Sequence, residues 1–284
     1  MEGIDFMEVA RRGSFVLEGL VILFVGKLFR DLFALSRGYK TSELLTAHDN
    51  PAVAIDLCGY LVGLVLGVLG SLVVSSETWL GQASDIALTG LVVIACLLLA
   101  SWVADKAIFR GIDDHAALAE DRNVALALGR AGVFIGTGLV VRGALGPDSA
   151  LVDCVAWVGI GLLAMVVMSL VYQRVTPYDD LAQIRDNNVA AALPLAGVVL
   201  AVGIIVEAAI GGPVESWSED LASVGIYLGV SLVFLLVLRV LADLFLLPGA
   251  SLSKEVAEDR NTGAGLVEGT SFVCGAMLLA FFLT

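Results

Sequence analysis

The amino-acid sequence predicts an all-α, polytopic membrane bundle of eight transmembrane helices, arranged as two parallel four-helix repeats that each contain two hairpins. Three observations lead to this prediction. The 284 residues are 58% hydrophobic and only 16% charged, with a mean hydropathy of +0.93. Long apolar stretches recur along the whole chain, and one residue pattern returns at an offset of 138. Because soluble domains carry roughly a quarter charged residues, this composition excludes a soluble enzyme and a disordered chain.

Eight apolar stretches are long enough to cross a bilayer, since a spanning helix needs about 20 residues. They cover residues 14–35, 51–74, 86–108, 123–145, 151–173, 189–210, 221–246 and 262–283. No segment between them is long enough to form a separate soluble domain. The chain is therefore expected to consist of membrane helices and short connections.

Lys and Arg residues divide the connections into two classes. The loops 75–85, 146–150 and 211–220 contain none, whereas each of the other four linkers carries two. Because cytoplasmic loops are enriched in Lys and Arg, we expect the four basic linkers in the cytoplasm and both termini outside. Each linker also predicts a short amphipathic helix with an N-terminal cap, at residues 41–45, 113–118, 177–181 and 253–256.

The offset of 138 indicates a tandem duplication. The pentapeptide AEDRN occurs at residues 119–123 and again at 257–261, and the same offset relates Asp105 to Asp243. We therefore divide the chain into a first repeat, 1–146, and a second repeat, 147–284. Four helices are an even number, so both repeats have the same orientation in the membrane and are parallel repeats.

A weaker pattern divides each repeat into two hairpins. An asparagine ends each basic linker and opens the next apolar helix, and small residues follow it at positions +2 and +4. An aspartate precedes each asparagine by one or two positions. The four pairs are Asp49 with Asn50, Asp121 with Asn123, Asp186 with Asn188, and Asp259 with Asn261.

The four motif sequences HDNPAVA, EDRNVALA, RDNNVAAA and EDRNTGAG resemble those of the family called domain of unknown function 350, the YjfL-type bacterial inner-membrane proteins. The resemblance covers nearly the whole chain as two tandem copies. It implies a multi-pass protein in the inner or plasma membrane of a bacterium or another prokaryote, and it implies no particular reaction.

Two interpretations of the Asp/Asn motif are open. An asparagine side chain at the start of a helix accepts hydrogen bonds from the free backbone N–H groups, and a carboxylate there complements the helix dipole. Alternatively, the four pairs surround a common vestibule and hold cations or a partner protein. The first interpretation makes these residues structural, and the second makes them a site.

Three ionisable residues lie inside the predicted spans at similar depth. Arg130 and Glu268 each follow their repeat asparagine by seven residues, and Asp56 follows its own by six. At a rise of about 1.5 Å per residue, all three lie roughly 10 Å inside the membrane. Such residues usually face a protein interior or water. We expect a polar layer in which Arg130 pairs with Glu268 or with Asp56.

Glycines repeat at intervals of four residues in several spans, including Gly59 with Gly63 and Gly225 with Gly229. Small residues at this spacing let helices approach closely in lipid. They predict close packing inside the bundle, and they also allow a homodimer through the Gly-rich helices.

Composition and motifs argue against several other functions. The net charge of −13 gives no basic surface for a nucleic acid. The four cysteines stand apart from one another and from both histidines, so no metal site is expected. Walker loops, nucleophile elbows and HExxH motifs are absent, which favours a protein that is not an enzyme and needs no cofactor.

Two hypotheses for the function follow. In the first, the bundle moves a small ion or solute through the polar layer of Asp56, Arg130 and Glu268 between the repeats. In the second, the bundle is a non-transporting membrane scaffold whose linkers recruit a cytoplasmic partner, for instance in a response to membrane stress.

Overall fold

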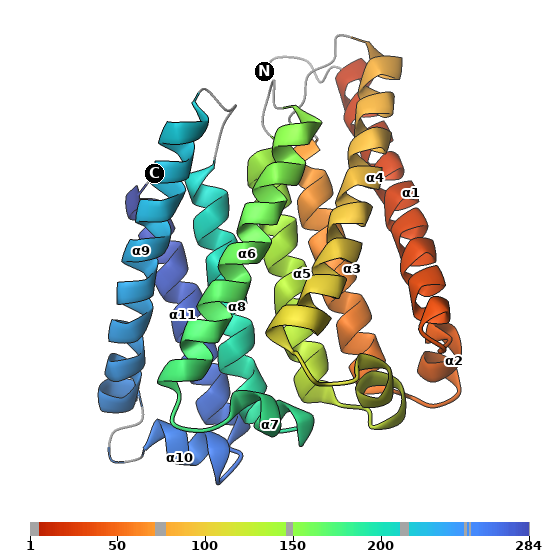
Figure 1. Cartoon of the computed structure of the whole chain (residues 1–284). Coiled ribbons are helices and arrows are strands. Elements are labelled where there is room, and N and C mark those ends of the chain that lie inside the picture. Colours follow the sequence, from red (N-terminus) through yellow and green to blue (C-terminus); the bar gives the residue numbers. More distant parts are fainter. Residues whose placement is uncertain are drawn as a thin grey trace.

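The computed structural model describes residues 6–71, 78–145, 150–210, 216–246, 249 and 251–283. Eight long helices stand side by side within these residues (Figure 1). They are α1 (Phe6–Ser36), α3 (Pro51–Ser71), α4 (Trp79–Val103), α5 (Val124–Ala144), α6 (Leu151–Val175), α8 (Val189–Ala209), α9 (Trp217–Leu241) and α11 (Thr262–Leu283). The predicted all-α class and the helical bundle are confirmed.

Seven of these helices are long and apolar enough to cross a membrane. The exception is α1, which has 31 residues but carries seven charged side chains. The helix α4 begins at Trp79 rather than at the expected residue 86, because Thr78 caps it by accepting a hydrogen bond from the Gly81 N–H at 3.1 Å. Residues 72–74 of the second expected span lie outside the described residues, as do parts of the loops 75–85, 146–150 and 211–220.

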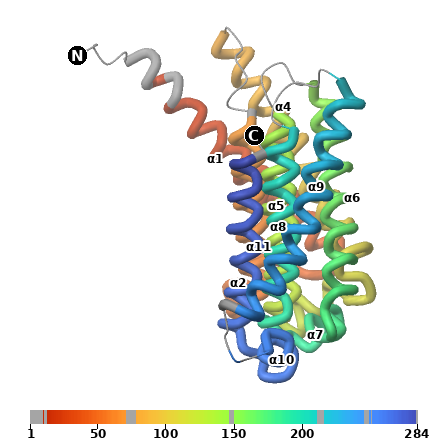
Figure 2. The backbone as a smooth tube through the Cα atoms, turned by 90° about the vertical axis from the view of Figure 1, so that its left-hand side faces the viewer, coloured from red at the N-terminus to blue at the C-terminus, as the bar shows by residue number. Residues whose placement is uncertain are grey.

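The helices form two layers. The returning helices α3, α5, α8 and α11 pack side by side in one row, and the outgoing helices α1, α4, α6 and α9 lie against that row. Figure 2 shows α11 on one side of the bundle and α6 and α9 on the other. The central helices α5 and α8 are the most buried, because each lies between two returning helices and also contacts outgoing helices.

Glycines let the returning helices touch through their backbones. A methyl group added to Gly63 would overlap the backbone of Phe134 on α5, and one added to Gly197 would overlap the backbone of Gly269 on α11. The predicted role of small residues in packing is therefore correct for these helices. By contrast, a methyl group added to Gly225 or Gly229 on α9 would have no described atom within 4 Å.

All four basic linkers contain a short helix, and all four lie at one end of the bundle, here called the linker end (Figure 1). These helices are α2 (Thr41–Thr46), the π-helical turn η2 (Ala116–Glu120), α7 (Asp180–Arg185) and α10 (Leu252–Ala257). Two further π-helical segments, η1 (Ala104–Ile108) and η3 (Ala242–Leu246), extend α4 and α9 toward the same end.

The expected N-terminal caps are present in part. Asp113 and Asp179 accept hydrogen bonds from backbone N–H groups at the starts of η2 and α7. The prediction is wrong for α2, which follows Lys40, a residue without an acceptor atom in its side chain. At α10 the side chain of Ser251 makes no cap, and Asp243 of η3 accepts from the Leu252 N–H instead, at 2.9 Å.

Candidate functional site

The repeat asparagines cap the returning helices. Asn123 Oδ1 accepts from the Leu126 N–H at 2.8 Å, and Asn50 Oδ1 accepts from the Ala52 N–H at 3.0 Å. The equivalent bonds of Asn188 and Asn261 run to Ala190 and Ala264. These bonds are those of the first interpretation, in which the motif starts a helix.

The amide nitrogens of Asn50, Asn123 and Asn188 each join one hairpin to the linker of the next. Nδ2 of Asn50 donates to the Leu118 carbonyl at 2.8 Å, Nδ2 of Asn123 to that of Ile184 at 2.7 Å, and Nδ2 of Asn188 to that of Val256 at 2.9 Å. Sequence reasoning missed these bonds, because a capping motif carries no signal about a carbonyl more than 60 residues away. We call the four linkers joined in this way the linker belt.

The last asparagine ends the series. Asn261 has no following linker within the chain, and its Nδ2 donates to Glu255 Oε2 of its own linker at 2.8 Å. It is exposed, whereas the other three asparagines are 1% exposed. The four motif aspartates, Asp49, Asp121, Asp186 and Asp259, are also exposed, and the helices that follow them stand in one row.

A left-handed backbone precedes each repeat asparagine. The φ angles are 46° at Asp49, 50° at Arg122, 56° at Asn187 and 50° at Arg260. Residues with a Cβ atom rarely adopt this conformation, although Asn and Asp tolerate it better than others. The turn recurs at all four linkers, so it is a property of the repeat.

Arg130 lies at the centre of a buried group of charges in the first repeat. Its Nε donates to Asp56 Oδ1 at 2.6 Å, its Nη1 donates to Asp105, and its Nη2 donates to Ser101 Oγ at 2.8 Å. The side chain of Arg130 is fully buried and Asp56 is 3% exposed. Of the two partners expected for Arg130, Asp56 is the one found.

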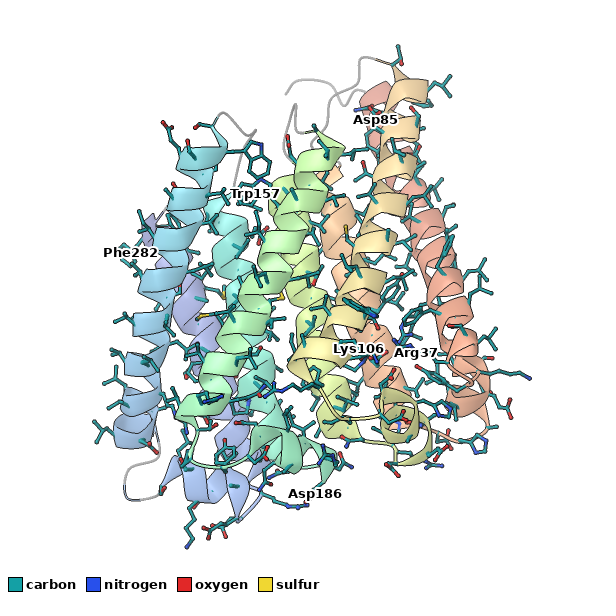
Figure 3. All side chains as sticks on the ribbon, viewed as in Figure 1. Arg37, Asp85, Lys106, Trp157, Asp186 and Phe282 are labelled. Atoms are coloured by element: carbon teal, nitrogen blue, oxygen red, sulfur yellow. The ribbon has the colours of Figure 1, made fainter. Side chains whose placement is uncertain are left out.

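Arg30 of α1 and Arg37, which directly follows α1, complete this group. Arg30 donates to Asp56, and Arg37 donates to Asp105 at 2.7 Å and to Asp114. Figure 3 shows Arg37 between α1 and the end of α4. The N-terminal cluster, as we call it, thus holds three arginines and three aspartates: Arg30, Arg37, Arg130, Asp56, Asp105 and Asp114. Positive and negative charges in it are balanced.

Glu268 lies apart from these residues, in the second repeat. Its Oε1 accepts from Arg239 of α9 and, at 3.1 Å, from the Tyr172 hydroxyl of α6. The three residues expected in one polar layer therefore fall into two groups. We call the second group, Tyr172, Tyr178, Asp180, Arg239 and Glu268, the C-terminal cluster.

The C-terminal cluster has two carboxylates, Asp180 and Glu268, but one guanidinium group, Arg239. Glu268 is fully buried, and its Oε2 has no hydrogen-bond partner among the described residues. Asp180 is 1% exposed, and its Oδ1 has no partner among them either. Thr176 donates to the other oxygen of Asp180. Burial raises the pKa of Asp180 to about 7, although Thr176 and Arg239 favour its ionised form. Burial and the nearby carboxylates of Glu268 and Asp180 also raise the pKa of Tyr178.

The two clusters are variants of one arrangement. Positions 130 and 268 are related by the repeat offset of 138, and so are positions 101 and 239. In the first repeat the arginine stands on the returning helix and contacts Ser101 on the outgoing helix. In the second repeat the arginine, Arg239, stands on the outgoing helix and the returning helix carries Glu268. The repeat offset could have revealed this exchange, but the sequence alone does not show that these positions touch.

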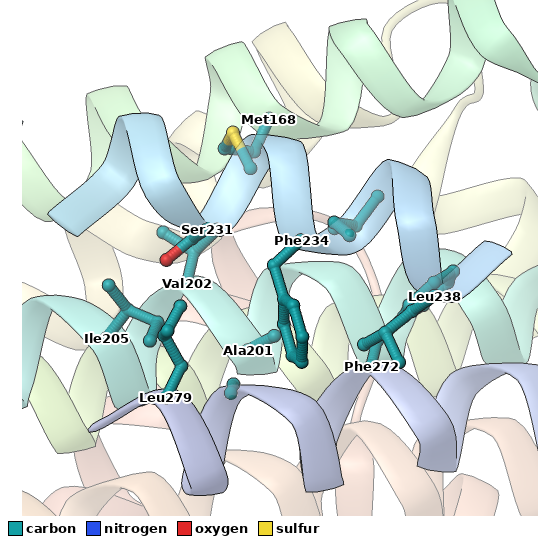
Figure 4. A pocket seen from close by; sticks show the side chains of 11 residues that line it. Met168, Ala201, Val202, Ile205, Ser231, Phe234, Leu238, Phe272 and Leu279 are labelled. Carbon is teal, nitrogen blue, oxygen red and sulfur yellow. The ribbon is translucent and has the colours of Figure 1, made fainter. Parts of the chain in front are cut away.

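A small apolar cavity lies beyond Glu268, between α6, α8, α9 and α11 (Figure 4). Its volume is about 20 Å³, which is room for one water molecule. Met168, Phe234 and Phe272 line it, and Ser231 is the one hydroxyl-bearing residue in its wall. Phe272 packs edge to face with Tyr172 at a ring distance of 5.9 Å, so aromatic rings separate the cavity from Glu268.

At the linker end, a larger pocket of about 550 Å³ lies against the same cluster. Thr176, Tyr178 and Asp180 form part of its wall. Asp180 is thus placed between this open pocket and the buried Glu268. Within the described residues, no three His, Cys, Asp or Glu side chains are grouped as a metal site would require.

The sequence model of the family described as Domain of Unknown Function (DUF350) matches residues 8–145 and again residues 148–283. The inner membrane protein YjfL (UPF0719) of Escherichia coli K12 is 26% identical over 132 residues, which are 45% of this chain and 91% of that protein. YjfL of E. coli O157:H7 matches with the same values. No solved structure matches the chain at a significant level. The two matches fit the two-repeat layout of the bundle, and the chain belongs to the DUF350 family of multi-pass inner-membrane proteins.

Proposed function

We propose that the protein moves a small cation, most simply a proton, across the membrane through its second repeat, with Glu268 as the binding group. The observation that carries the proposal is the Glu268 carboxylate, which is fully buried at membrane depth and has one oxygen without a partner in the part of the chain that the structure describes. An ionisable group in this position is costly, and such groups in membrane proteins usually belong to functional sites. Protonation of that oxygen would remove the cost.

Asp180 supports the same route. It lies next to the open pocket at the linker end, its Oδ1 lacks a partner, and its pKa of about 7 lets it bind and release protons near neutral pH. A proton would pass from the pocket to Asp180 and then to Glu268. The apolar cavity beyond Phe272 would act as a barrier that opens only when α9 moves, and α9 is the least buried of the seven apolar helices.

The N-terminal cluster is assigned a structural role in this proposal. Both carboxylate oxygens of Asp56 and of Asp105 accept from arginines, and Arg130 uses all three of its nitrogens in hydrogen bonds. Buried charges paired in this way fix the relative positions of helices, and they leave no carboxylate oxygen of Asp56 or Asp105 free for a transported cation. The proposed route therefore passes through the second repeat and not through the polar layer expected around Arg130.

Proton flux into liposomes tests the proposal. The full chain is reconstituted with a pH-sensitive dye inside, and a potassium diffusion potential drives the flux. Glu268→Gln should lower the flux at least about tenfold, which corresponds to about 1.4 kcal/mol. Glu207→Gln is the matched control, because Glu207 also lies on a spanning helix of the second repeat but pairs with Arg142. Flux of the unsubstituted chain no greater than that of empty liposomes would contradict the proposal.

A second candidate function is a membrane scaffold, and the linker belt favours it. Hydrogen bonds from Asn50, Asn123 and Asn188 join the four linkers into one surface. In the orientation predicted from Lys and Arg, this surface faces the cytoplasm, both termini lie outside, and the belt would recruit a cytoplasmic partner. Substitution of the exposed belt residues Glu43, Glu120 and Glu258 by Ala tests this role. An intact cellular phenotype in that variant would rule it out.

We also propose how two copies would pair. Most of the Gly-rich faces are used inside the bundle, but Gly225 and Gly229 are open on α9. A homodimer through the Gly-rich helices would therefore use α9. Neither candidate function involves a chemical reaction or a cofactor, so we propose that the protein is not an enzyme.

A further inference from the structure

Three arginines surround the 550 Å³ pocket at the linker end. Arg174 belongs to the last turn of α6, Arg185 ends α7, and Arg110 lies in the segment that follows η1. All three side chains are exposed. The chain has 29 acidic and 16 basic residues, so this grouping of exposed positive charge is opposite in sign to its net charge.

None of these arginines forms an ion pair with a carboxylate in the part of the chain that the structure describes. Arg110 donates to Gln173 Oε1 at 3.4 Å, and Arg185 donates to the Gly111 carbonyl at 3.1 Å. For Arg174 the described residues provide no hydrogen bond or ion pair. The guanidinium groups are therefore held around the pocket without being neutralised.

Two aspartates also line the pocket, and each has one carboxylate oxygen in a hydrogen bond. Asp179 Oδ1 accepts from the Ala182 N–H at 3.0 Å as the cap of α7, and Asp180 is buried with Thr176 as its donor. The three arginines thus outnumber the carboxylates. The pocket should attract an anion.

The position of the pocket suggests which anion. Leu170, one turn back along the spanning helix α6, forms part of the wall and is 37% exposed. The pocket therefore opens where the apolar surface of α6 meets the polar linker end. Basic pockets between membrane helices at this level bind lipid headgroups, and guanidinium groups bind phosphate oxygens in pairs.

We infer that the pocket lined by Arg110, Arg174 and Arg185 binds a phosphate group, carried either by an anionic phospholipid or by a soluble phosphate ester. A volume of about 550 Å³ is in the range of small-ligand sites. Leu170 would lie beside the acyl chains of a lipid. The phosphate site uses the arginines of this pocket, whereas the proposed proton route uses Asp180 in its wall and the buried Glu268.

Lipid binding to the full chain in a non-ionic detergent tests the inference. Native mass spectrometry counts phosphatidylglycerol and, as the zwitterionic comparison, phosphatidylcholine. The variant with Arg110→Gln, Arg174→Gln and Arg185→Gln should bind phosphatidylglycerol about tenfold more weakly. The control removes the same charge from exposed residues outside the pocket lining, with Lys40→Gln, Arg122→Gln and Lys254→Gln, and should change binding by less than about twofold.

A second arm distinguishes the two sources of phosphate. Glycerol 3-phosphate is added to the detergent-solubilised chain, and the shift in its thermal unfolding temperature is measured. A shift that the pocket variant loses, without selective lipid binding, identifies a soluble ester as the ligand. Arg174→Gln alone guards against misfolding, because this side chain contributes no described hydrogen bond. The inference is overturned if neither ligand binds selectively, or if the control variant weakens binding as much as the pocket variant.

Discussion

Arg130 and Glu268 occupy equivalent positions in the two repeats, yet each pairs only with opposite charge from its own repeat. Arg130 contacts Asp56 and Asp105, and Glu268 contacts Arg239. The duplication has thus produced two separate buried clusters rather than one layer between the repeats. The two clusters and the linker belt can each be tested on their own.

The first prediction concerns the balance of the N-terminal cluster. Arg130→Gln should lower the free energy of unfolding by about 3 kcal/mol or more, because it leaves Asp56 and Asp105 buried with fewer partners. Arg142→Gln is the control; its ion pair with Glu207 is partly exposed, and its loss should cost about 1 kcal/mol or less. Unfolding in detergent measures both. Equal losses of unfolding free energy in the two variants would show that burial does not determine how much an ion pair contributes to stability.

The second prediction concerns variants that place the arginine and serine of the N-terminal cluster at the equivalent positions of the second repeat. Arg239→Ser alone leaves the buried Glu268 without its cationic partner, and Glu268→Arg alone places two arginines together. Each single change should therefore be destabilising by about 3 kcal/mol. The double variant recreates the arginine and serine of the first repeat and keeps Asp243, the equivalent of Asp105. It should be more stable than either single variant in a double-mutant cycle. Additive losses would refute the equivalence of the two sites.

The third prediction is a pH dependence. The carboxyl of Asp180 has a pKa of 3.8 in its ordinary state and about 7 in the folded chain. Between these values the folded chain holds a proton that the unfolded chain has released, so rising pH lowers the free energy of unfolding. The stabilisation is present in full below the ordinary pKa and is lost as the pH rises through about 7.

Asp180→Asn isolates this effect. Thermal unfolding of both chains is followed from acidic to mildly alkaline pH. The variant should gain stability relative to the unsubstituted chain as the pH rises from about 4 to about 7, and the difference should level off above that. The difference between the two curves removes the contributions of all other titrating groups. A difference that does not vary with pH would refute the prediction.

The fourth prediction compares two asparagines of the same motif. Asn123→Ala removes a cap and also the donor to the Ile184 carbonyl, so it should be destabilising by about 2–3 kcal/mol. Asn261→Ala removes a cap on an exposed residue that joins no further linker, and it should cost about 1 kcal/mol. Urea or detergent unfolding measures both, and similar losses would mean that the belt bonds contribute little.

The fifth prediction concerns the left-handed turn. Arg122→Asn places at this position the residue type that the third linker already has, Asn187, and should be stabilising by about 0.5 kcal/mol. Glu120→Asn, two residues earlier in the helical turn η2, should be slightly destabilising instead. The two changes replace a charged side chain with the same residue, so opposite signs would identify the backbone conformation as the cause.

Much of the fold could be predicted because lipid imposes strict lengths on its helices. Spans, hairpins and the duplication follow from apolar runs and from the recurrence of AEDRN. The site could be predicted less well. The depth of Glu268 in the membrane follows from its distance along the chain from Asn261. Its pairing with Arg239 depends on how α9 packs against α11. Sequences of helices in lipid carry no strong periodic signal that shows which faces pack together. The pocket arginines come from three separate segments, which only the fold brings together.

The belt bonds also set an order of assembly. The side-chain bond of Asn50 can form only after residue 118 has been synthesised. Those of Asn123 and Asn188 can form only after residues 184 and 256. In a chain that enters the membrane from its N-terminus, each of the first three hairpins is therefore bonded to the linker of the next one once that linker has been made. Assembly in this order would form the three bonds one after another, and a chain whose synthesis stopped between two linkers would lack the bond that joins its last hairpin to the next linker.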